Sequence, residues 1–366
     1  MNRLAMSCLV LAFSAHAATN SPSISLLLDH TQSFELTAGL SQYENPSKFP
    51  GKVTSVGGGI VDMLMNRWAR EFATLFPDIR IETHGGGTVA GFTNLLEGKV
   101  DLVPASRQLL PAEVTRFKAK FGYEPAQIIV AQDALGIYVS KGNPIAGLTL
   151  AQLDAIYSRD SMRGGGRPEF WRELGVTGPL ADERISRVCH SRVHGGHLFF
   201  QEYVMQGAEY RFDVHFQSVP SSVTQAVGAE DAAIGFASMI FATARTRCVP
   251  VQVTDGRYLL PTYENVVDGQ YPLVRPMRIV FHRKPDGGMN PAAREFLRFA
   301  VSRRGQRIIA LAGSYPLTVE QQREALRVIG SDSGKPGPRT AVKSVDAPGT
   351  QSERKRKSAA AATPPN

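Results

Sequence analysis

Apolar and polar positions along the chain follow two periods, one typical of strands and one typical of helices. Strict alternation in the run IRIE at 79–82 predicts a half-buried strand. Large apolar side chains at a helical spacing, from Leu64 through Trp68 to Phe76, predict a helix with one buried face. The same patterns predict further strands at 52–55, 100–103, 128–131, 135–139, 233–236 and 277–281, and further helices at 88–97, 111–121, 149–156, 197–205, 223–227, 290–301 and 318–329.

Strand-like and helix-like runs alternate along most of the chain, with short turns between them. That alternation predicts an α/β fold with largely parallel sheets. No segment repeats at a period of roughly 20–50 residues, which argues against a solenoid or a propeller. A length of 366 residues is too great for one small core and fits about two domains.

Residues 1–18 have the three parts of a secretory signal peptide. Arg3 supplies the positive start, residues 4–13 form a short apolar core, and the run AHA at 15–17 is a small-x-small cleavage sequence. A buried N-terminal helix is less favoured, because the apolar run is short and polar sequence follows it. We therefore predict an exported chain, periplasmic or secreted. No uncharged apolar run reaches about 18 residues, so no integral membrane protein is predicted.

The formal charge of +8 first suggests a nucleic-acid partner, but its location changes that interpretation. Residues 331–366 contain seven lysines and arginines against three acidic residues, including the run RKRK at 354–357. This segment has almost no large apolar residues and is predicted to be a disordered basic tail. The chain before it is only mildly basic, so no nucleic-acid partner is predicted.

The three cysteines are too few for a disulfide-rich scaffold or a zinc-ribbon array. Cys8 lies in the predicted signal peptide, which leaves Cys189 and Cys248 in the mature chain. In an exported protein these two could form one disulfide, or they could be two buried free thiols. The sequence leaves both alternatives open.

Three glycine-rich turns, at 57–59, 85–91 and 195–196, each lead toward a predicted helix. Bare backbone N–H groups at a helix start, aided by the helix dipole, bind anions. One such turn is weak evidence, because tight turns need glycine anyway. Three in one α/β chain strengthen the case for an anion site.

Several longer strings are similar to one protein family. They include VAQDALGIYVSKGNPIAGLTLAQLDAIYS from residue 130, AAIGFASM from 232 and EGKVDLVPASRQL from 97. In order and spacing these strings resemble the phosphate-binding, type II periplasmic binding proteins of ABC importers, over about residues 50–320. The resemblance implies two α/β lobes, joined by two crossover strands and closing on a ligand in the cleft between them.

The resemblance also implies how the chain is divided. Lobe 1 would comprise residues 51–134 and 270–330, and lobe 2 residues 135–269, with a signal peptide at 1–18, an N-terminal extension at 19–50 and the disordered tail at 331–366.

The resemblance implies that phosphate is held by hydroxyls, by backbone N–H groups at helix starts and by an arginine. Four loops would supply those groups here. The ligand-binding residues predicted in them are Gly58, Gly59, Ile60, Gly87, Thr88, Ser106, Arg107, His190, Arg192, His194, Gly195 and Gly196.

These loops lack most of the anion-binding side chains of the family pattern. The motif Gly-Arg-x-x-x-Ser-Gly-Thr falls on 189–196, where the arginine is His190, the serine is His194 and the threonine is Gly196. The first loop, at 57–60, has neither hydroxyl of the family's Gly-Ser-x-Thr. Charge-assisted bonds are worth about 1.5–3 kcal/mol each. Phosphate affinity therefore depends on compensation by a nearby arginine, or by histidines charged below about pH 6.5.

The histidines also suggest a metal site, because His190, His194 and His197 follow an H-x3-H-x2-H spacing beside Cys189. No carboxylate lies in this cluster, and the glycine pair would leave it flexible. Ordinary polar lining of a cleft is therefore preferred, and no metal is predicted. No nucleophile with an orienting acid is evident, so neither catalysis nor a cofactor is predicted.

We therefore predict a solute-binding protein, not an enzyme, that captures phosphate or a related small oxyanion for an ABC importer. Its partners would be that oxyanion and the ABC transporter permease, and it is expected to be a monomer. The alternative is a phosphate-binding-like scaffold without a transport role, used in sensing, adhesion or envelope interaction, with weak or no phosphate binding.

Overall fold

The computed structural model describes residues 30–44, 48–192 and 194–330. The predicted signal peptide at 1–18 and the predicted tail at 331–366 lie outside these ranges. None of the helices in the described ranges is long and apolar enough to cross a bilayer.

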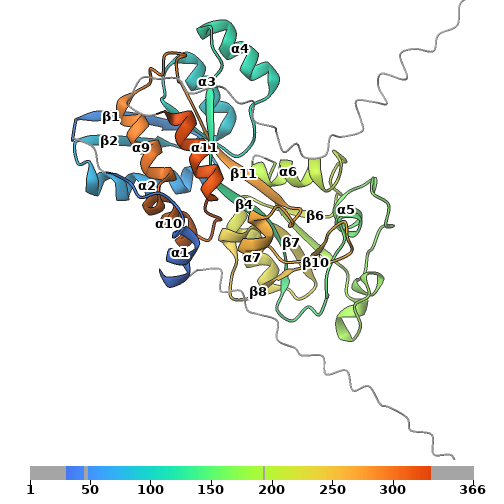
Figure 1. Ribbon diagram of the computed structural model, residues 1–366. Helices are drawn as coiled ribbons and strands as arrows, with labels where there is room; N and C mark the ends of the chain where they lie inside the picture. The colour runs from blue at the N-terminus through green and yellow to red at the C-terminus, as the bar shows by residue number, and fades with distance from the viewer. Residues whose placement is uncertain (1–29, 45–47, 193, 331–366) are drawn as a thin grey trace, which may run out of the picture.

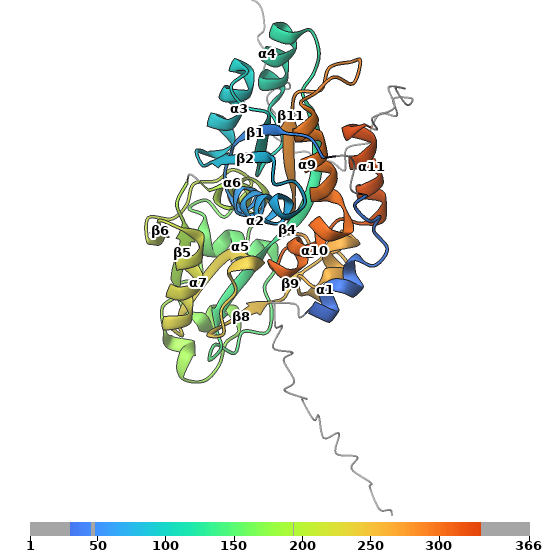
Figure 2. The same ribbon diagram turned by 90° about the vertical axis from the view of Figure 1, so that its left-hand side faces the viewer.

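The described chain forms two α/β lobes, which Figure 1 shows side by side and Figure 2 shows one above the other. Helices flank the strands of the first lobe. Its elements from the N-terminal half of the chain are α1 (His30–Thr37), β1 (Gly51–Val56), α2 (Ile60–Leu75), β2 (Ile79–His84), α3 (Gly87–Glu97), β3 (Leu102–Ala105) and α4 (Pro111–Phe121). The C-terminal segment adds α9 (Pro291–Val301), α10 (Arg303–Leu311) and α11 (Val319–Ile329).

The middle of the chain builds the second lobe. Its helices are α5 (Leu150–Tyr157), α6 (Gly195–Tyr203), α7 (Pro220–Ala229) and α8 (Tyr263–Val267), with short 3-10 helices η1 (Trp171–Leu174), η2 (Pro179–Asp182) and η3 (Met239–Phe241). Its strands are β5 (Ser186–His190), β6 (Val214–Gln217), β7 (Ala233–Ser238), β8 (Thr246–Val249), β9 (Val251–Gln252) and β10 (Tyr258–Leu259). β5 lies between β6 and β7 and is parallel to both, whereas β9 and β10 form a separate two-stranded sheet.

One long strand belongs to both lobes. β4 (Ala126–Ser140) runs antiparallel to β11 (Val274–Phe281) along its first half, and antiparallel to β7 and β8 along its second half. β11 carries the chain back from the second lobe to the first. The strand order is therefore β2-β1-β3-β11-β4-β7-β5-β6, with β8 paired to β4. The predicted α/β class is confirmed, but the expected predominance of parallel pairing is wrong. Among the described strands, only the pairs of β1 with β2 and β3, and of β5 with β6 and β7, are parallel, because β4 and β11 cross between the lobes and pair antiparallel with their neighbours.

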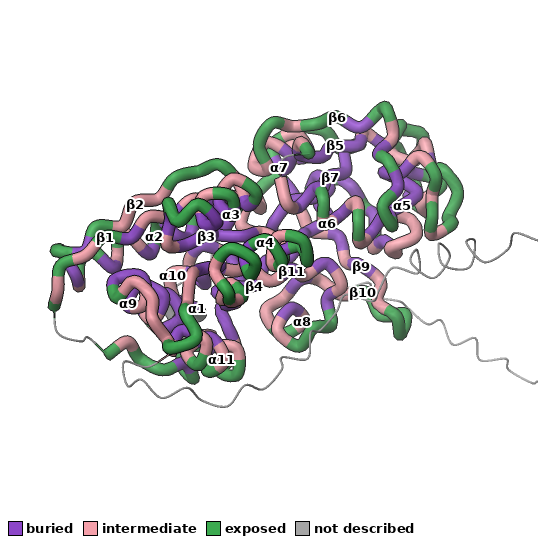
Figure 3. The backbone as a smooth tube through the Cα atoms, turned by 90° about the horizontal axis from the view of Figure 1, so that it is seen from above, coloured by how far each residue is buried: buried purple, intermediate pink, exposed green. Residues whose placement is uncertain are grey.

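Each lobe has a hydrophobic core of its own, and Figure 3 shows buried backbone running through both. The core of the second lobe comes from residues 134–273 together with Tyr315. The main core of the first lobe comes from residues 53–131 and 277–329, and it buries the apolar face of α2, including Trp68. Each lobe therefore has its own hydrophobic core, and the region between the two cores can hold a binding site.

Most predicted elements form where the pattern places them, because their ends carry strong signals. Pro111 begins α4 and Gly122 ends it in a left-handed conformation. The main difference concerns the strands predicted at 128–131 and 135–139, which are one continuous strand, β4. The polar residues between them stay in the ladder, because Asp133 is paired with a residue of β11.

Cys189 and Cys248 are both free thiols in the structure. Of the two alternatives that the sequence leaves open, the disulfide is therefore not formed here. Cys189 is buried at the end of β5, and Cys248 lies in β8.

Candidate functional site

A cavity of about 220 Å³ lies between the lobes. Its walls come from the first turn of α2, the loop after β3, the first turn of α6, and β11. The lining residues are Gly59, Ile60, Met63, Ser106, His190, His194, Gly195, Gly196, Pro220, Ser238, Phe241 and Arg275. No carboxylate is among these residues, so the one permanent charge of the lining is the guanidinium of Arg275.

Three helices begin at this cavity: α2 of the first lobe, and α6 and α7 of the second. α7 begins with Pro220, which has no N–H to offer, so α2 and α6 supply the free N–H groups. α2 begins after Gly59, whose φ of 72° favours glycine, and α6 begins after His194. Neither residue makes a side-chain hydrogen bond that caps its helix. The first N–H groups of a helix have no partner within the helix, and the dipole adds partial positive charge there. This pair of helix starts is therefore suited to an anion.

Arg275 occupies the point where the two lobes meet. It lies opposite Asp133 in the register of β11 and β4, and its Nε and Nη2 atoms each lie 2.8 Å from Oδ2 of Asp133. Ser238 donates a hydrogen bond to the other carboxylate oxygen. Nη1 is buried and has no hydrogen-bond partner among the described residues. The space beside it is narrow, since a Cβ on Gly195 would lie 3.2 Å from Nη1 and 2.5 Å from Oγ of Ser106.

The Asp133 carboxylate holds the guanidinium in place without filling the cavity. Burial raises the pKa of Asp133, whereas the charge of Arg275 and the bond from Ser238 oppose that rise. Two of the three guanidinium nitrogens are engaged by this carboxylate, and the third remains unpaired. An unpaired buried donor costs about 1–3 kcal/mol. A ligand that accepts a hydrogen bond from Nη1 would remove that cost.

His190 forms an inner wall of the cavity and is only 2% exposed. Burial, reinforced by the charge of Arg275, lowers the pKa of His190 to about 3. Burial also lowers the pKa of His197, which lies behind it and outside the cavity lining. His190 is therefore neutral at neutral pH and throughout the mildly acidic range. The charge that the sequence analysis expects from histidines below about pH 6.5 does not come from this residue.

The first two glycine-rich loops pack against each other. The N–H of Gly87 donates to the carbonyl of Gly57 at 2.8 Å, and a Cβ on Gly58 would lie 2.6 Å from the Cα of Gly87. The serine of the family pattern therefore has no room at position 58. Thr88 retains its hydroxyl, but that hydroxyl accepts a bond from the N–H of Ser106 at 3.3 Å.

The site residues predicted from the sequence fall into two groups. Those that line the cavity are Gly59, Ile60, Ser106, His190, His194, Gly195 and Gly196, and those outside its lining are Gly58, Gly87, Thr88, Arg107 and Arg192. Both arginines are engaged elsewhere, because Arg107 makes two bonds to Glu113 and Arg192 pairs with Glu209 at the surface. The compensating charge thus comes from a different arginine.

Five lining residues are not anticipated by the sequence analysis: Met63, Pro220, Ser238, Phe241 and Arg275. The most important of them, Arg275, is 142 positions from its partner Asp133, and no local motif surrounds it. The one available clue is the position of Asp133, where the chain is expected to cross between lobes. A buried acid at a crossing calls for a basic partner on the adjacent strand.

Gly196→Thr, which introduces the family residue, is expected to lower the free energy of unfolding by about 1–3 kcal/mol. A Cβ there would lie 2.8 Å from Nε2 of His190, whose ring also packs on Phe236. Urea unfolding measures the loss. In the control Gly85→Thr, where no atom lies within 4 Å of the added Cβ, the change should stay below about 0.5 kcal/mol. An equal loss for Gly196→Thr in a His190→Ala background would contradict the steric explanation.

Comparison with known sequences finds relatives among the phosphate-binding proteins. A profile of the PBP superfamily domain matches residues 14–304 of the chain. The phosphate-binding protein PstS of Pseudomonas aeruginosa is 31% identical over 293 residues, which cover 80% of this chain and 91% of that protein. The phosphate-binding protein PstS of Staphylococcus epidermidis is 26% identical over 260 residues, which cover 70% of this chain and 75% of that protein.

Solved structures with the same fold include proteins of phosphate ABC transporters. A substrate-binding protein assigned to a phosphate ABC transporter of Clostridium perfringens, solved with bound phosphate, is 27% identical with a TM-score of 0.59. The match covers 73% of this chain and 100% of that one. An ABC-type phosphate transport receptor from Vibrio cholerae is 22% identical with a TM-score of 0.59, covering 72% of this chain and 100% of the receptor. At that identity the second likeness concerns the fold alone.

Proposed function

Since the chain belongs to the phosphate ABC transporter substrate-binding proteins of the PBP superfamily, we propose that it captures phosphate, or a related small oxyanion, between its lobes and delivers it to an ABC importer. The family is one of solute-binding proteins, and its fold is the type II periplasmic binding fold expected from the sequence. Within that family, this chain has altered ligand loops.

The observation that carries the proposal is the unpaired Nη1 of Arg275 in a cavity without carboxylates. Asp133 engages the Nε and Nη2 side of the guanidinium, and Nη1 lies beside Gly195, another lining residue, whose added Cβ would be 3.2 Å away. The neutral imidazole of His190 stands where the family motif has its arginine. Arg275 supplies a positive charge at the same cavity from a different strand.

We infer that the oxyanion lies between Nη1 of Arg275, the hydroxyl of Ser106 and the N–H groups that begin α2 and α6. Ser106 and α2 belong to the first lobe, and α6 belongs to the second. An anion bound by both sets of donors links the lobes. Binding therefore stabilises the closed arrangement over any open one, because the ligand contacts both lobes only when they are closed.

Export and delivery follow from the same proposal. The relatives are substrate-binding proteins, and the predicted signal peptide would place the chain in the periplasm or outside the cell. We propose an ABC transporter permease as the macromolecular partner. For this role we propose a monomer, as expected from the sequence.

Isothermal titration calorimetry of the ligand-stripped protein tests the proposal directly. We expect saturable binding of one phosphate per chain at pH 7.5, with a dissociation constant of about 1 μM or tighter, which corresponds to about −8 kcal/mol. Small-angle scattering before and after phosphate addition should report a decrease in the radius of gyration as the lobes close. Sulfate and arsenate, titrated in parallel, define the anion class.

The outcomes separate the candidate functions. Binding of sulfate but not phosphate would keep the oxyanion carrier and change its cargo. Absence of binding to every oxyanion tested would overturn the proposal. It would favour the alternative, a scaffold without a transport role that is used in sensing, adhesion or envelope interaction.

A further inference from the structure

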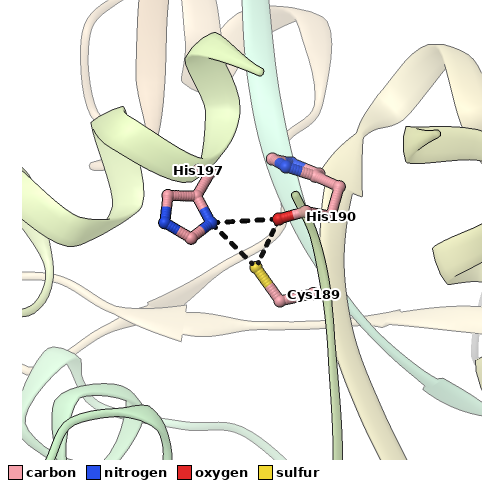
Figure 4. Close-up of side chains that lie close together, drawn as sticks. All are labelled: Cys189, His190 and His197. Carbon is pink, nitrogen blue, oxygen red and sulfur yellow. Dashed lines mark hydrogen bonds between the residues drawn. The ribbon is translucent and has the colours of Figure 1, made fainter. Parts of the chain in front are cut away.

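Behind the wall formed by His190 lies a second group of chemically reactive side chains. Cys189 and His190 end β5, and His197 lies in the first turns of α6. Cys189 and His197 have no exposed surface, and His190 is 2% exposed. Figure 4 shows the thiol of Cys189 and the ring of His197 close to each other and to the backbone carbonyl of His190, with the His190 ring to one side. Each offers one ligand atom, and these three atoms all lie within 4.8 Å of one another.

The spacing of two of the three ligand atoms matches that of ligands on one metal ion, and the nitrogen of His190 lies within 4.8 Å of both. Sγ of Cys189 lies 3.6 Å from Nδ1 of His197. A thiolate at about 2.3 Å and an imidazole nitrogen at about 2.0–2.1 Å from one metal are about 3.6–3.8 Å apart at tetrahedral or trigonal angles. The backbone carbonyl of His190 lies 3.0 Å from the same Nδ1 and 3.2 Å from Sγ. The first two ligand atoms therefore need almost no movement to share an ion.

Unpaired nitrogen atoms in the cluster give an independent reason to expect a ligand. Nδ1 of His190 and Nε2 of His197 are both buried, and neither has a hydrogen-bond partner among the described residues. Buried polar atoms are nearly always paired. Nδ1 of His197 faces Sγ of Cys189, so its unpaired Nε2 lies across the ring and is not the ligand atom. The unpaired nitrogen of His190 is therefore the one that calls for a partner. Coordination of a metal would use the lone pair of a His190 nitrogen that has no competing bond.

We propose that Cys189, His190 and His197 form a buried binding site for a soft, monovalent transition-metal ion of the Cu⁺ type. This departs from the sequence analysis, which predicts no metal. A thiol with two imidazoles is the ligand set of soft and borderline transition metals, whereas Mg²⁺ and Ca²⁺ require oxygen ligands. Three ligands suit a trigonal ion and leave a tetrahedral ion such as Zn²⁺ one short.

The charge of the surroundings favours a monovalent ion. On binding, the S–H bond of Cys189 breaks, its proton leaves to solvent, and a sulfur–metal bond forms. Nδ1 of His197 donates to the carbonyl of His190 in the structure, so its proton moves to the unpaired Nε2 when Nδ1 becomes a ligand. A thiolate with Cu⁺ is neutral overall, whereas a thiolate with Zn²⁺ leaves a net positive charge in a buried site that holds no carboxylate. Uncompensated buried charge is costly. The nearby guanidinium of Arg275, which already repels charge from His190, adds to that cost.

The cavity between the lobes provides the route to the site. His190 lines that cavity, whereas Cys189 and His197 do not. An ion that enters the cleft meets the imidazole of His190 first and reaches the thiol by passing this ring. The metal site and the proposed oxyanion site therefore share one wall but use different ligand atoms.

The test begins with a parent protein in which Cys8 and Cys248 are replaced by serine, so that Cys189 is the single thiol. Cu⁺ is titrated anaerobically in competition with the chromophoric chelator bicinchoninate. We expect one Cu⁺ per chain, and we expect Cys189→Ser and His197→Gln each to lower the affinity by more than about 100-fold, because each removes a direct ligand. His215→Gln, an exposed histidine on β6, is the matched control and should bind as the parent does.

If a variant fails to fold, measurements on the parent protein still test the proposal. X-ray absorption of the Cu⁺-loaded parent should show one sulfur and two or more nitrogen or oxygen neighbours. A sulfur-free spectrum, unchanged affinity in Cys189→Ser, or no stoichiometric binding in the parent would each overturn the site and leave a packed thiol with buried histidines. Tighter binding of Zn²⁺ than of Cu⁺ would overturn the choice of ion. Arg275→Gln should retain Cu⁺, which separates this result from any failure of anion binding.

Discussion

Arg275→Gln should weaken phosphate binding by a factor of about 100 or more. The substitution removes the one permanent positive charge of the cavity lining and the donor Nη1. Nη1 carries two N–H groups. Losing two charge-assisted hydrogen bonds, each worth about 1.5–3 kcal/mol, corresponds to a loss of about 10²–10⁴ in affinity. Calorimetric titration of phosphate into the variant and the parent measures the change.

Controls must separate lost recognition from lost stability, because Arg275→Gln leaves the Asp133 carboxylate buried without its partner. Removing one member of a buried pair costs about 3–5 kcal/mol. The double variant Asp133→Asn/Arg275→Gln removes both charges and should regain most of the stability but none of the affinity. Arg187→Gln removes another buried arginine, which pairs with the half-exposed Asp213 outside the cavity lining, and should destabilise without weakening phosphate binding. Phosphate affinity equal to that of the parent in Arg275→Gln would contradict the proposed site.

Trp68→Ala should lower the free energy of unfolding by about 3–5 kcal/mol. Trp68 has no exposed surface, and its Nε1 donates to the carbonyl of Gly305 at 2.9 Å, which joins α2 to α10. The substitution therefore leaves a cavity in the core of the first lobe and a buried carbonyl without its donor. Equilibrium unfolding in urea measures the effect.

A control on the same helix distinguishes core packing from the binding surface. Met63 is 41% exposed and lines the cavity between the lobes. Met63→Ala should change the free energy of unfolding by less than about 0.5 kcal/mol. If the two substitutions on α2 destabilise the protein equally, the buried and exposed faces of α2 have been assigned incorrectly.

Local signals in the sequence predict much of this fold. Thr318 caps α11 and Thr149 caps α5, each by accepting a bond from the N–H three residues on. These signals are visible because a cap or a turn depends on residues that are neighbours along the chain. The continuity of β4 is not visible in this way. Gln132 and Asp133 interrupt its apolar pattern. Pairing with β11 keeps both in the strand, and Gln132 is also held by a bridge to Tyr315.

The candidate site also has one part that local sequence reveals and another that only the tertiary structure reveals. Ser106, His190 and Gly195 line the cavity, and the loops that hold them can be found by their resemblance to family motifs. The direction of a side chain is a tertiary property, so the sequence does not reveal that Arg107 turns to Glu113. Nor does it reveal that Arg275 reaches the cavity, because that depends on the register of two strands far apart in the chain.

The contact between the first two glycine-rich loops also constrains how this sequence can evolve. Position 58 cannot accept a side chain while the Cα of Gly87 lies 2.6 Å from the place its Cβ would take. A mutation to serine at position 58 is thus harmful unless the second loop has already moved. Gaining a hydroxyl at position 58 would have to pass through a less stable intermediate, which makes the two loops epistatic. The two loops are therefore expected to change together rather than one at a time.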